Sequence, residues 1–365
     1  MRIRLSATLA FVLSLATFSC AAGTAAPRPP QAARPPATPT EAAQAPGASV
    51  PRVRLVATGG TISNRQGGRL SAEELVKAIP ELSRYATPEF EQFANVASSS
   101  MTLAQWLDLS RRINTLFRTD AALAGVVVTS GTDTLEELAY FLNLTVRDER
   151  PVVVVGSMRN PSTLGYEGAA NLLEGFRVAA DPASRGRGVL VVLNDEINAA
   201  REVTKTDALR LQTFQTRGYG ILGVVDSDRV VYYRRVERRH TSESEFDVFA
   251  IQELPRVDVF LTYQGAPGDL IRAAIDAGAH GIVLATAGAG ATSGTQREGI
   301  QYAMTKNVPV VTTTRTGSGR IAGGRGRGLS VAGEDLAPIK ARILLMLGLA
   351  TTKDPAELRR MFGEY

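Results

Sequence analysis

The sequence is poor in the two residue types that most often carry nucleophilic or metal chemistry: it has one cysteine, Cys20, and two histidines among 365 residues. A single cysteine can form no internal disulfide and cannot supply a thiolate cluster for a metal. Because Cys20 lies ahead of every segment that predicts a fold, we expect the folded body to contain no thiol. A nucleophile in that body is therefore expected to be a hydroxyl.

The chain also has little excess charge, with 41 Lys+Arg against 36 Asp+Glu and a net charge of +5. Residues 1–50 contain four arginines and one glutamate, so +3 of this charge belongs to them and only +2 to the remainder. Such a nearly neutral body lacks the basic footprint of a nucleic-acid-binding protein, and we expect no nucleic-acid partner. Apolar residues make up 44% and charged residues 21%, a balance typical of soluble globular proteins, and the length favours two domains.

Long hydrophobic runs are missing as well. The apolar run Leu5–Phe18 follows a short cationic start and is too short for a comfortable membrane-spanning helix. We interpret residues 1–26 as an export signal peptide. Small residues after Phe18 leave two outcomes open, cleavage after Ala22–Ala26 or lipid attachment at Cys20. The second outcome would be the chain's one contact with a membrane.

Residues 27–51 hold 8 of the 18 prolines and no aromatic residue. A segment of this composition cannot bury enough apolar surface to fold. We therefore expect a disordered Pro/Ala-rich tether between the export signal and the folded body.

From residue 53 onward, short β-branched runs alternate with amphipathic stretches. Four apolar runs predict buried parallel strands, and two stretches with apolar residues at helical spacing predict helices. The strands are expected at 53–57, 125–128, 151–155 and 188–193, and the helices at 103–117 and 135–144. This alternation predicts an α/β fold with a larger N-terminal domain over residues 52–239, built on an open, mostly parallel sheet flanked by helices. Binding sites in such sheets lie at the carboxyl ends of the strands.

A charged, Ser-rich stretch interrupts this rhythm, and we interpret residues 240–257 as a linker. The strand pattern resumes after it, and two terminal helices each begin at or near a proline. Strands are expected at 258–261, 281–285 and 308–311, and helices at 338–349 and 355–362. Residues 258–365 are therefore expected to form a smaller C-terminal α/β domain.

Polar motifs follow the predicted strands. The strand 53–57 ends in Thr58-Gly-Gly-Thr-Ile62, where two glycines permit a sharp turn and Thr61 offers a hydroxyl. The strand 125–128 ends in Thr129-Ser-Gly-Thr-Asp-Thr134. A plain structural interpretation of the second motif remains open, in which Asp133 or Thr134 caps the following helix and its first acidic residues complement the helix dipole.

A third polar segment favours a functional interpretation of these motifs over a purely structural one. The strand 188–193 leads into Asn-Asp-Glu-Ile197, and Ala200-Arg-Glu-Val-Thr-Lys-Thr206 follows. Lys205 is one of only five lysines in a chain that otherwise uses arginine. Unlike a guanidinium, an ammonium group titrates when it is desolvated, so this choice of residue suggests a proton-managing amine.

These motifs together resemble the bacterial L-asparaginase family of the exported type, which includes asparaginase/glutaminases. The resemblance rests on TGGTI at 58–62, GTDTLEE at 131–137, VGSMR at 155–159 and NDEI with AREVTKT up to residue 206, and runs from about 53 to 365. It implies hydrolysis of the side-chain amide of L-asparagine, with side activity on glutamine, in the periplasm. It also implies a homotetramer built from intimate dimers and no metal or organic cofactor.

The resemblance also implies roles for individual residues. Thr61 would attack the amide and form an acyl-enzyme, while Thr132, Asp133 and Lys205 would position substrate or water and relay protons. Backbone amides near Gly60 and in the turn 129–132 would stabilise the oxyanion. The substrate-binding residues would be Gly60, Ser98, Ser99, Thr132, Asp133 and Ser157, with Ser98 and Ser99 at the α-carboxylate and Asp133 at the α-ammonium. Neither histidine is needed, and His240 and His280 are interpreted as structural or surface residues.

Three departures from the family pattern affect the expected substrate. The loop 63–70 is short and lacks the tyrosine that assists the nucleophile, so activation of Thr61 must come from elsewhere or be weaker. Ser130 replaces the histidine of the common THGTDT motif. In the second domain, residues 263–268 lack the expected asparagine and 315–328 are basic where an acid is expected. Two alternatives therefore stay open: an amidase for a larger or different amide, and a non-catalytic amino-acid-binding homologue.

Overall fold

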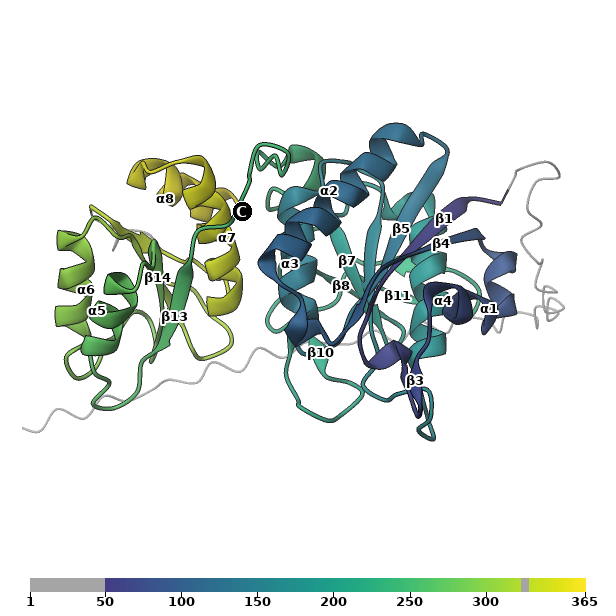
Figure 1. The fold of residues 1–365 in the computed structure, drawn as a ribbon, viewed down its shortest axis with the longest axis horizontal. Coiled ribbons are helices and arrows are strands. Elements are labelled where there is room, and N and C mark those ends of the chain that lie inside the picture. Colours follow the sequence, from purple (N-terminus) through teal and green to yellow (C-terminus); the bar gives the residue numbers. More distant parts are fainter. Residues whose placement is uncertain (1–49, 323–327) are drawn as a thin grey trace, which may run out of the picture. The chain divides into compact units, whose positions relative to one another are not determined.

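The computed structural model describes residues 50–322 and 328–365. The export signal expected at 1–26, and all but the last two residues of the tether expected at 27–51, lie outside this part of the chain. Among the described helices none is long and apolar enough to cross a membrane. The structure consists of an N-terminal and a C-terminal group of elements, each built around its own sheet (Figure 1).

The N-terminal elements form an eight-stranded sheet in the order β12-β11-β8-β7-β6-β5-β1-β4. Its central strands are parallel, because β1 pairs in parallel with β4 and β5, and β5, β6 and β7 follow in parallel. The strands are β1 (Arg52–Gly59), β4 (Thr87–Val96), β5 (Leu123–Thr129), β6 (Val152–Val155), β7 (Val189–Leu193), β8 (Glu196–Ala199), β11 (Gly223–Val225) and β12 (Val230–Tyr232). The four expected strands are present and parallel, whereas β4 and the antiparallel strands β8, β11 and β12 were not predicted.

Helices cover both faces of this sheet (Figure 1). They are α1 (Ala72–Lys77), α2 (Leu103–Thr119), α3 (Leu135–Thr145) and α4 (Gly168–Ala180). The strand residues alternate between two cores: Val126 and Val128 pack with α2 and α3, while Val127 packs with α1 and α4. This alternation of buried residues explains why β5 is apolar along its whole length.

The C-terminal elements form a four-stranded parallel sheet in the order β13-β14-β15-β16. The elements are β13 (Val257–Leu261), α5 (Asp269–Asp276), β14 (Gly281–Thr286), α6 (Gln296–Thr305), β15 (Val310–Thr314), β16 (Ser330–Ala332), α7 (Pro338–Thr351) and α8 (Pro355–Glu364). The expected fold class, a larger mostly parallel sheet with helices and a smaller α/β domain, is confirmed. The third C-terminal strand begins at Val310, two residues later than expected.

Helix α7 joins the two groups of elements. It packs on β13, β14 and β15 with one side and on α3 with the other. Eight of its residues are buried, and the core that it shares with α2 and α3 continues into the C-terminal sheet. A helix that is apolar all round is one that is buried on all sides. Phe246 and Ile251, in the stretch expected to be a linker, are buried in the same core.

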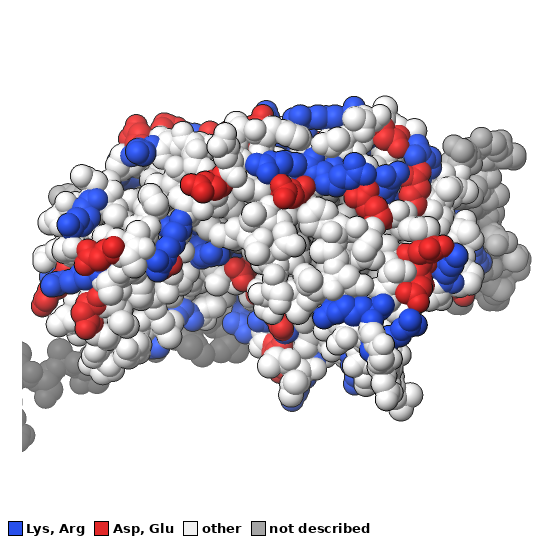
Figure 2. All heavy atoms as spheres, in the orientation of Figure 1, with Lys and Arg blue, Asp and Glu red and all other residues white. Residues whose placement is uncertain are grey.

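Charged side chains of both signs lie interspersed on the face drawn in Figure 2. Ion pairs such as Arg112 with Glu91 and Arg150 with Asp148 join charges of opposite sign elsewhere in the described chain as well. The visible face therefore carries no large field of a single sign.

Candidate active site

Two glycines end β1 and let its turn approach the turn after β5. Gly59 and Gly60 have φ of 105° and 90°, in the region that favours glycine. A Cβ atom on Gly60 would lie 2.3 Å from the backbone nitrogen of Gly131, so no other residue fits without movement. Because β1 and β5 are parallel neighbours, the turns that carry Thr61 and Thr132 meet at one edge of the sheet.

Two hydrogen bonds between the ends of β1 and β5 hold the two turns in register. The Thr58 hydroxyl donates to the carbonyl of Thr129 at 2.6 Å, and the Thr58 amide donates to the Thr129 hydroxyl at 3.2 Å. Both residues are buried. The position of the Thr61 turn relative to the 129–134 turn is therefore fixed by the fold.

The two turns form the floor of a small polar pocket of about 80 Å³. Residues from four segments line it: Gly60, Thr61, Asn64, Arg69, Ala97, Ser98, Gly131, Thr132 and Asp133. Of the expected site residues, the structure brings Gly60, Thr61, Ser98, Thr132 and Asp133 to this pocket. Ser99 and Ser157 are not among its lining residues.

Lys205 reaches the same turn from a distant segment. It lies on β9 (Thr204–Lys205), which pairs with β10 (Phe214–Gln215). Its Nζ donates to the Thr132 hydroxyl at 3.0 Å and to Oδ1 of Asp133 at 3.0 Å. Only 16% of the Lys205 side chain is exposed, against 73% for Asp133. The arrangement places an amine, a hydroxyl and a carboxylate in contact, which are the groups that a proton relay needs.

Glu136, at the start of α3, holds the strand that carries Lys205. Its Oε1 accepts hydrogen bonds from the Lys205 amide and the Thr204 hydroxyl, both at 3.0 Å. Its Oε2 lies 3.8 Å from Nζ of Lys340. Lys340 is fully buried, which lowers its pKa to about 8, and its amine donates to the carbonyls of Arg201 and Val203. Glu136 is therefore a positioning residue for Lys205.

Ser98 packs against the 131–134 turn. It is buried, and a Cβ atom on Gly131 would lie 2.8 Å from its hydroxyl oxygen. That oxygen accepts a hydrogen bond of 3.4 Å from the Thr134 amide. Ser99, in contrast, is exposed, and the buried Ser157 donates to the carbonyl of Arg159 at 2.6 Å. The roles expected of these three serines stay predictions.

A tyrosine does lie close to the Thr61 turn, although it comes from elsewhere in the chain. The Tyr166 hydroxyl donates to the carbonyl of Ile62 at 2.9 Å. Burial raises the pKa of Tyr166, so its hydroxyl stays protonated and holds the turn. Sequence spacing could not find this contact, because 104 positions separate the two residues.

Two family models match the chain. The model described as "Asparaginase, N-terminal" matches residues 52–238, and the model described as "Glutaminase/Asparaginase C-terminal domain" matches residues 256–362. The chain belongs to the bacterial L-asparaginase family.

Individual proteins show the same likeness. L-asparaginase 2 of Bacillus subtilis (strain 168) is 40% identical over 328 residues, which cover 87% of this chain and 87% of that protein. A probable periplasmic L-asparaginase of Haemophilus influenzae is 38% identical over 331 residues, covering 87% and 94%. Among solved structures, a probable cytoplasmic L-asparaginase of Campylobacter jejuni has a TM-score of 0.81 and 36% identity, covering 86% of this chain and all of that one.

The short loop of this asparaginase-family chain is a hairpin. It consists of β2 (Asn64–Arg65) and β3 (Gly68–Arg69), which are paired antiparallel. The Gln66 amide donates to the hydroxyl of Ser162 at 2.9 Å, which ties the tip of the hairpin to a second loop. The sequence correctly indicates that the loop has no tyrosine, but not that Asn64 and Arg69 line the pocket.

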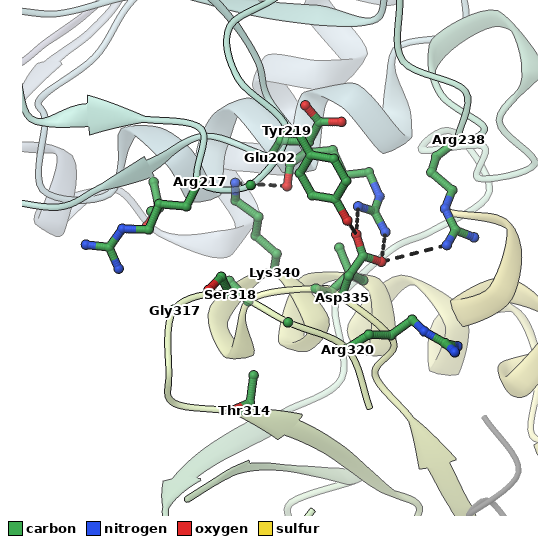
Figure 3. Close-up of a pocket in the computed structure, with 16 residues that line it drawn as sticks. Glu202, Arg217, Tyr219, Arg238, Thr314, Gly317, Ser318, Arg320, Asp335 and Lys340 are labelled. Atoms are coloured by element: carbon green, nitrogen blue, oxygen red, sulfur yellow. Dashed lines mark hydrogen bonds and ion pairs between the residues drawn. The ribbon is translucent and has the colours of Figure 1, made fainter. Parts of the chain in front are cut away.

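A second, larger cavity of about 360 Å³ lies between the N-terminal and C-terminal elements of the asparaginase-family fold (Figure 3). Arg201 and Asp335 both line it and form a bidentate ion pair, with 2.7 Å from Nη1 to Oδ2 and 2.8 Å from Nη2 to Oδ1. Burial opposes ionisation of Asp335, but its hydrogen bonds with Arg201 outweigh this effect and hold its pKa well below the usual range. Neither the motif at 58–62 nor the motif at 129–134 contributes a residue to this cavity. Its ion pair links the two groups of elements.

Within the described residues, no group of three or more His, Cys, Asp and Glu side chains is arranged to hold a metal ion. Burial lowers the pKa of His240, whose Nδ1 lies 2.8 Å from the hydroxyl of Thr241. His280 lines a different cavity, which shares no lining residue with the pocket that contains Thr61 and Thr132.

Proposed function

We propose that this chain hydrolyses the side-chain amide of L-asparagine to L-aspartate and ammonia, with glutamine as a second substrate. The observation that carries the proposal is the pocket that Thr61 lines together with Thr132 and Asp133, the two residues that Lys205 contacts. Membership of the asparaginase family and the names of the relatives support the substrate class.

The first half of the reaction uses Thr61. Its hydroxyl oxygen bonds to the amide carbon, the C–N bond breaks, and the nitrogen gains a proton and leaves as ammonia. The product is an ester between Thr61 and the substrate acyl group. The hydroxyl is a poor nucleophile at neutral pH, so a base has to remove its proton. Tyr166 cannot serve, because it stays protonated and donates to Ile62.

We assign the proton transfers to the Lys205–Thr132 contact. The Lys205 amine accepts the Thr132 proton across their 3.0 Å contact as the Thr132 oxygen accepts one from Thr61, or from water in the second half-reaction. The same path in reverse gives the proton to the departing nitrogen. In the second half-reaction, water attacks the ester carbon, the bond to Thr61 breaks, and Thr61 regains its proton. Asp133 would balance the charge of Lys205 and bind the substrate ammonium.

Backbone amides would stabilise the oxyanion, but the Gly60 amide is already used. It donates to the carbonyl of Val96 at 2.9 Å, and the Ser130 amide donates to Val155 at 2.8 Å. We therefore place the oxyanion donors at the adjacent amides, those of Thr61 and Thr132. Gly60 then serves mainly to let the two turns approach each other.

The size of the pocket favours a small substrate. Two residues of the hairpin, Asn64 and Arg69, are among those that line it. A larger amide would need the hairpin to move. A binding protein without turnover would not need the Lys205–Thr132 contact, which holds a largely desolvated amine against a hydroxyl.

Ammonia release from purified protein tests the proposal. We expect turnover of asparagine, slower turnover of glutamine and little release from an asparaginyl peptide. Fastest release from the peptide would favour the larger-amide alternative. No release from any of the three, together with calorimetric binding of asparagine, would favour the binding homologue.

We also propose the cellular and assembly states that the resemblance implies. The first is export to the periplasm by residues 1–26, with lipid attachment at Cys20 as an alternative to cleavage. The second is a division of the chain into a tether at 27–51, domains at 52–239 and 258–365, and a linker at 240–257. The third is assembly as a homotetramer. One relative is named periplasmic and another cytoplasmic, so fractionation of cells that express the full chain is the test. Sedimentation of the mature protein tests the tetramer.

A further inference from the structure

The cavity of about 360 Å³ in Figure 3 lies at the carboxyl end of β15, the edge at which open parallel sheets bind ligands. One of its walls is the loop that follows β15, through residues 317–320. These residues belong to the basic segment 315–328, of which the structure describes 315–322 and 328. None of them lines the pocket that contains Thr61, so the proposed hydrolysis gives this loop no role.

The backbone of the loop 317–319 has the form of an anion-binding site. Gly317 and Gly319 have positive φ, 81° and 97°, whereas Ser318 between them does not. Alternation of this kind turns successive N–H groups toward one side, which makes a concave site for an anion. The amides of all three residues lack a hydrogen-bond partner among the residues that the structure describes. They are therefore free to bind a ligand.

The side chains around the cavity carry an excess of positive charge. Among the described residues, five cations and two acids line it: Arg201, Arg217, Arg238, Arg320, Lys340, Glu202 and Asp335. Both acids already have arginine partners, because Asp335 binds Arg201 and Glu202 binds Arg234 at 2.5 Å. No acid in this lining is therefore left to bind a cation, such as the ammonium group of an amino acid.

Arg217 supplies a cation that no described acid balances. Its side chain forms no ion pair or hydrogen bond with any residue among 50–322 and 328–365. A Cβ atom on Gly317 would lie 2.5 Å from Nη1 of Arg217, so the guanidinium lies directly against the loop (Figure 3). Arg217 and residues 317–319 are all exposed, so a ligand can reach them.

We propose that Arg217 and the loop 317–319 bind a small oxyanion of the phosphate class, either free phosphate or the phosphate group of a monoester. Backbone amides, the Ser318 hydroxyl and a guanidinium are donors that fit phosphate oxygens, and a guanidinium binds two of them at once. The volume of the cavity leaves room for the organic part of a monoester. The cavity shares no lining residue with the pocket that contains Thr61, so it is a second site and not a subsite for the amide substrate.

Calorimetric titration of the purified full chain tests the proposal without depending on its hydrolytic activity. Sodium phosphate is titrated at neutral pH, with the ionic strength held constant by sodium chloride, and saturable binding at one site per chain is expected. Arg217→Gln is expected to weaken this binding by about tenfold to a hundredfold, the effect of losing hydrogen bonds from a charged donor. Arg315→Gln is the matched control, because Arg315 lies on the same exposed loop but does not line the cavity. Its affinity should match that of wild type.

A second variant keeps the charge and changes the shape of the site. Gly317→Ala places a methyl group against Arg217 and is expected to weaken phosphate binding, although every cation remains. Thermal unfolding of each variant checks that the fold is retained. Titration with glycerol 3-phosphate identifies the source of the oxyanion. Tighter binding than that of phosphate supports a monoester, and equal or weaker binding supports free phosphate.

The inference is overturned if wild type does not bind phosphate, or if Arg217→Gln binds it as tightly as wild type. It also fails if Arg217→Gln and Arg315→Gln lose affinity equally, which would indicate a general effect of surface charge. Displacement of phosphate by saturating L-aspartate would place the anion in the pocket that contains Thr61, and would overturn the inference as well. Phosphate binding by a chain that releases no ammonia would contradict the proposed hydrolysis and support the second site.

Discussion

The side-chain nitrogen of Lys205 lies within hydrogen-bond distance, 3.0 Å, of the hydroxyl of Thr132, although 73 positions separate the two residues. The contact depends on two separate supports. Thr132 lies on the turn after the central strand β5, and Lys205 is held through its amide by Glu136. A catalytic role for the pair requires this long-range placement, which is the basis of the first prediction.

Lys205→Met keeps much of the side-chain length but removes the amine. We expect kcat on asparagine to fall by about 10²–10⁴-fold, the usual effect of removing a general acid or base. Lys77→Met is a suitable control, because Lys77 is exposed and, among the residues that the structure describes, pairs only with Glu73. Ammonia release by the two variants checks the prediction, and an unchanged rate in Lys205→Met would rule out the relay.

Gly60→Ala should damage the site by crowding rather than by backbone strain alone. Gly60 and Gly67 have nearly equal φ, 90° and 85°, but a Cβ atom on Gly67 would meet nothing within 4 Å. The same substitution at Gly67 therefore carries the φ penalty without the clash with Gly131. We expect Gly60→Ala to be less stable than Gly67→Ala by about 1–3 kcal/mol in urea unfolding, the usual cost of overpacking. Equal stabilities would show that the turns can separate at no cost.

Glu174 should make stability depend on pH. Burial raises its pKa to about 8, and its Oε2 accepts a hydrogen bond from the Asp195 amide at 3.1 Å. A carboxyl whose pKa is raised in the folded state stabilises most below its unfolded pKa and loses that contribution as pH rises through the folded value. The free energy of unfolding should therefore fall between the unfolded value of 4.5 and about 8.

Glu174→Gln isolates this effect. Its unfolding free energy should fall less steeply with pH than that of wild type, by at most about 1.4 kcal/mol per pH unit, since other acids contribute equally to both proteins. Urea unfolding at several pH values measures the difference in slope. Parallel slopes would contradict the buried protonated state of Glu174.

Asp335→Asn should weaken the link between the two groups of elements. It preserves the size of the side chain but leaves the guanidinium of Arg201, 4% exposed, without its counter-charge. Breaking a buried ion pair in this way costs about 3–5 kcal/mol. Asp258→Asn, at the more exposed pair with Arg256, should cost about 1 kcal/mol or less. Similar losses from both variants in thermal unfolding would contradict the structural role of the Arg201–Asp335 pair.

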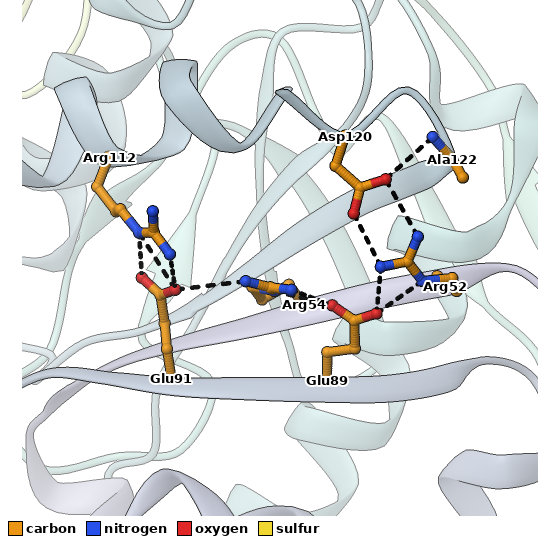
Figure 4. Close-up of polar contacts among 7 residues, drawn as sticks. All are labelled: Arg52, Arg54, Glu89, Glu91, Arg112, Asp120 and Ala122. Atoms are coloured by element: carbon orange, nitrogen blue, oxygen red, sulfur yellow. Dashed lines mark hydrogen bonds and ion pairs between the residues drawn. The ribbon is translucent and has the colours of Figure 1, made fainter. Parts of the chain in front are cut away.

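The buried strands could be predicted from the sequence, whereas the edges of the sheet could not. β5 and β7 are continuous apolar runs, because helices cover both faces of each. The edge strand β4 instead alternates apolar and acidic residues. Figure 4 shows how its acids are neutralised: Glu89 pairs with Arg52 and Arg54 of β1, and Glu91 pairs with Arg112 of α2. These charges disfavour pairing of the exposed edge with another chain. They also interrupt the hydrophobic run by which the strand could be recognised in the sequence.

The antiparallel strand β8 was missed for a different reason. The segment after β7 was expected to be a polar strand end, but Asn194 and Asp195 take positive φ of 53° and 64° and turn the chain back into the sheet. Asn and Asp tolerate this conformation, so the Asn194-Asp195 pair is itself a sequence signal for a tight turn between two antiparallel strands. In the sequence the same residues belong to a candidate functional motif, and this favours a loop over a strand.

Much of the candidate site could be anticipated because parallel neighbouring strands end at one edge. That rule brings Thr61 and Thr132 together without knowledge of any side-chain contact. Glu136 and Arg69 were not anticipated as site residues. Glu136 has the position of an ordinary helix-start acid, and Arg69 depends on the pairing of a short hairpin. Neither signal is distinguishable by spacing from a surface charge.

The most direct test of the central claim is the single-site variant Thr61→Val, which keeps the shape of the side chain and removes its hydroxyl. The account predicts that wild type releases ammonia from asparagine and that Thr61→Val does so at least about 10³-fold more slowly, by analogy with the loss of other catalytic nucleophiles. Calorimetric binding of asparagine by both proteins confirms that the pocket is intact. Equal rates of ammonia release would contradict the assignment of Thr61 as the nucleophile.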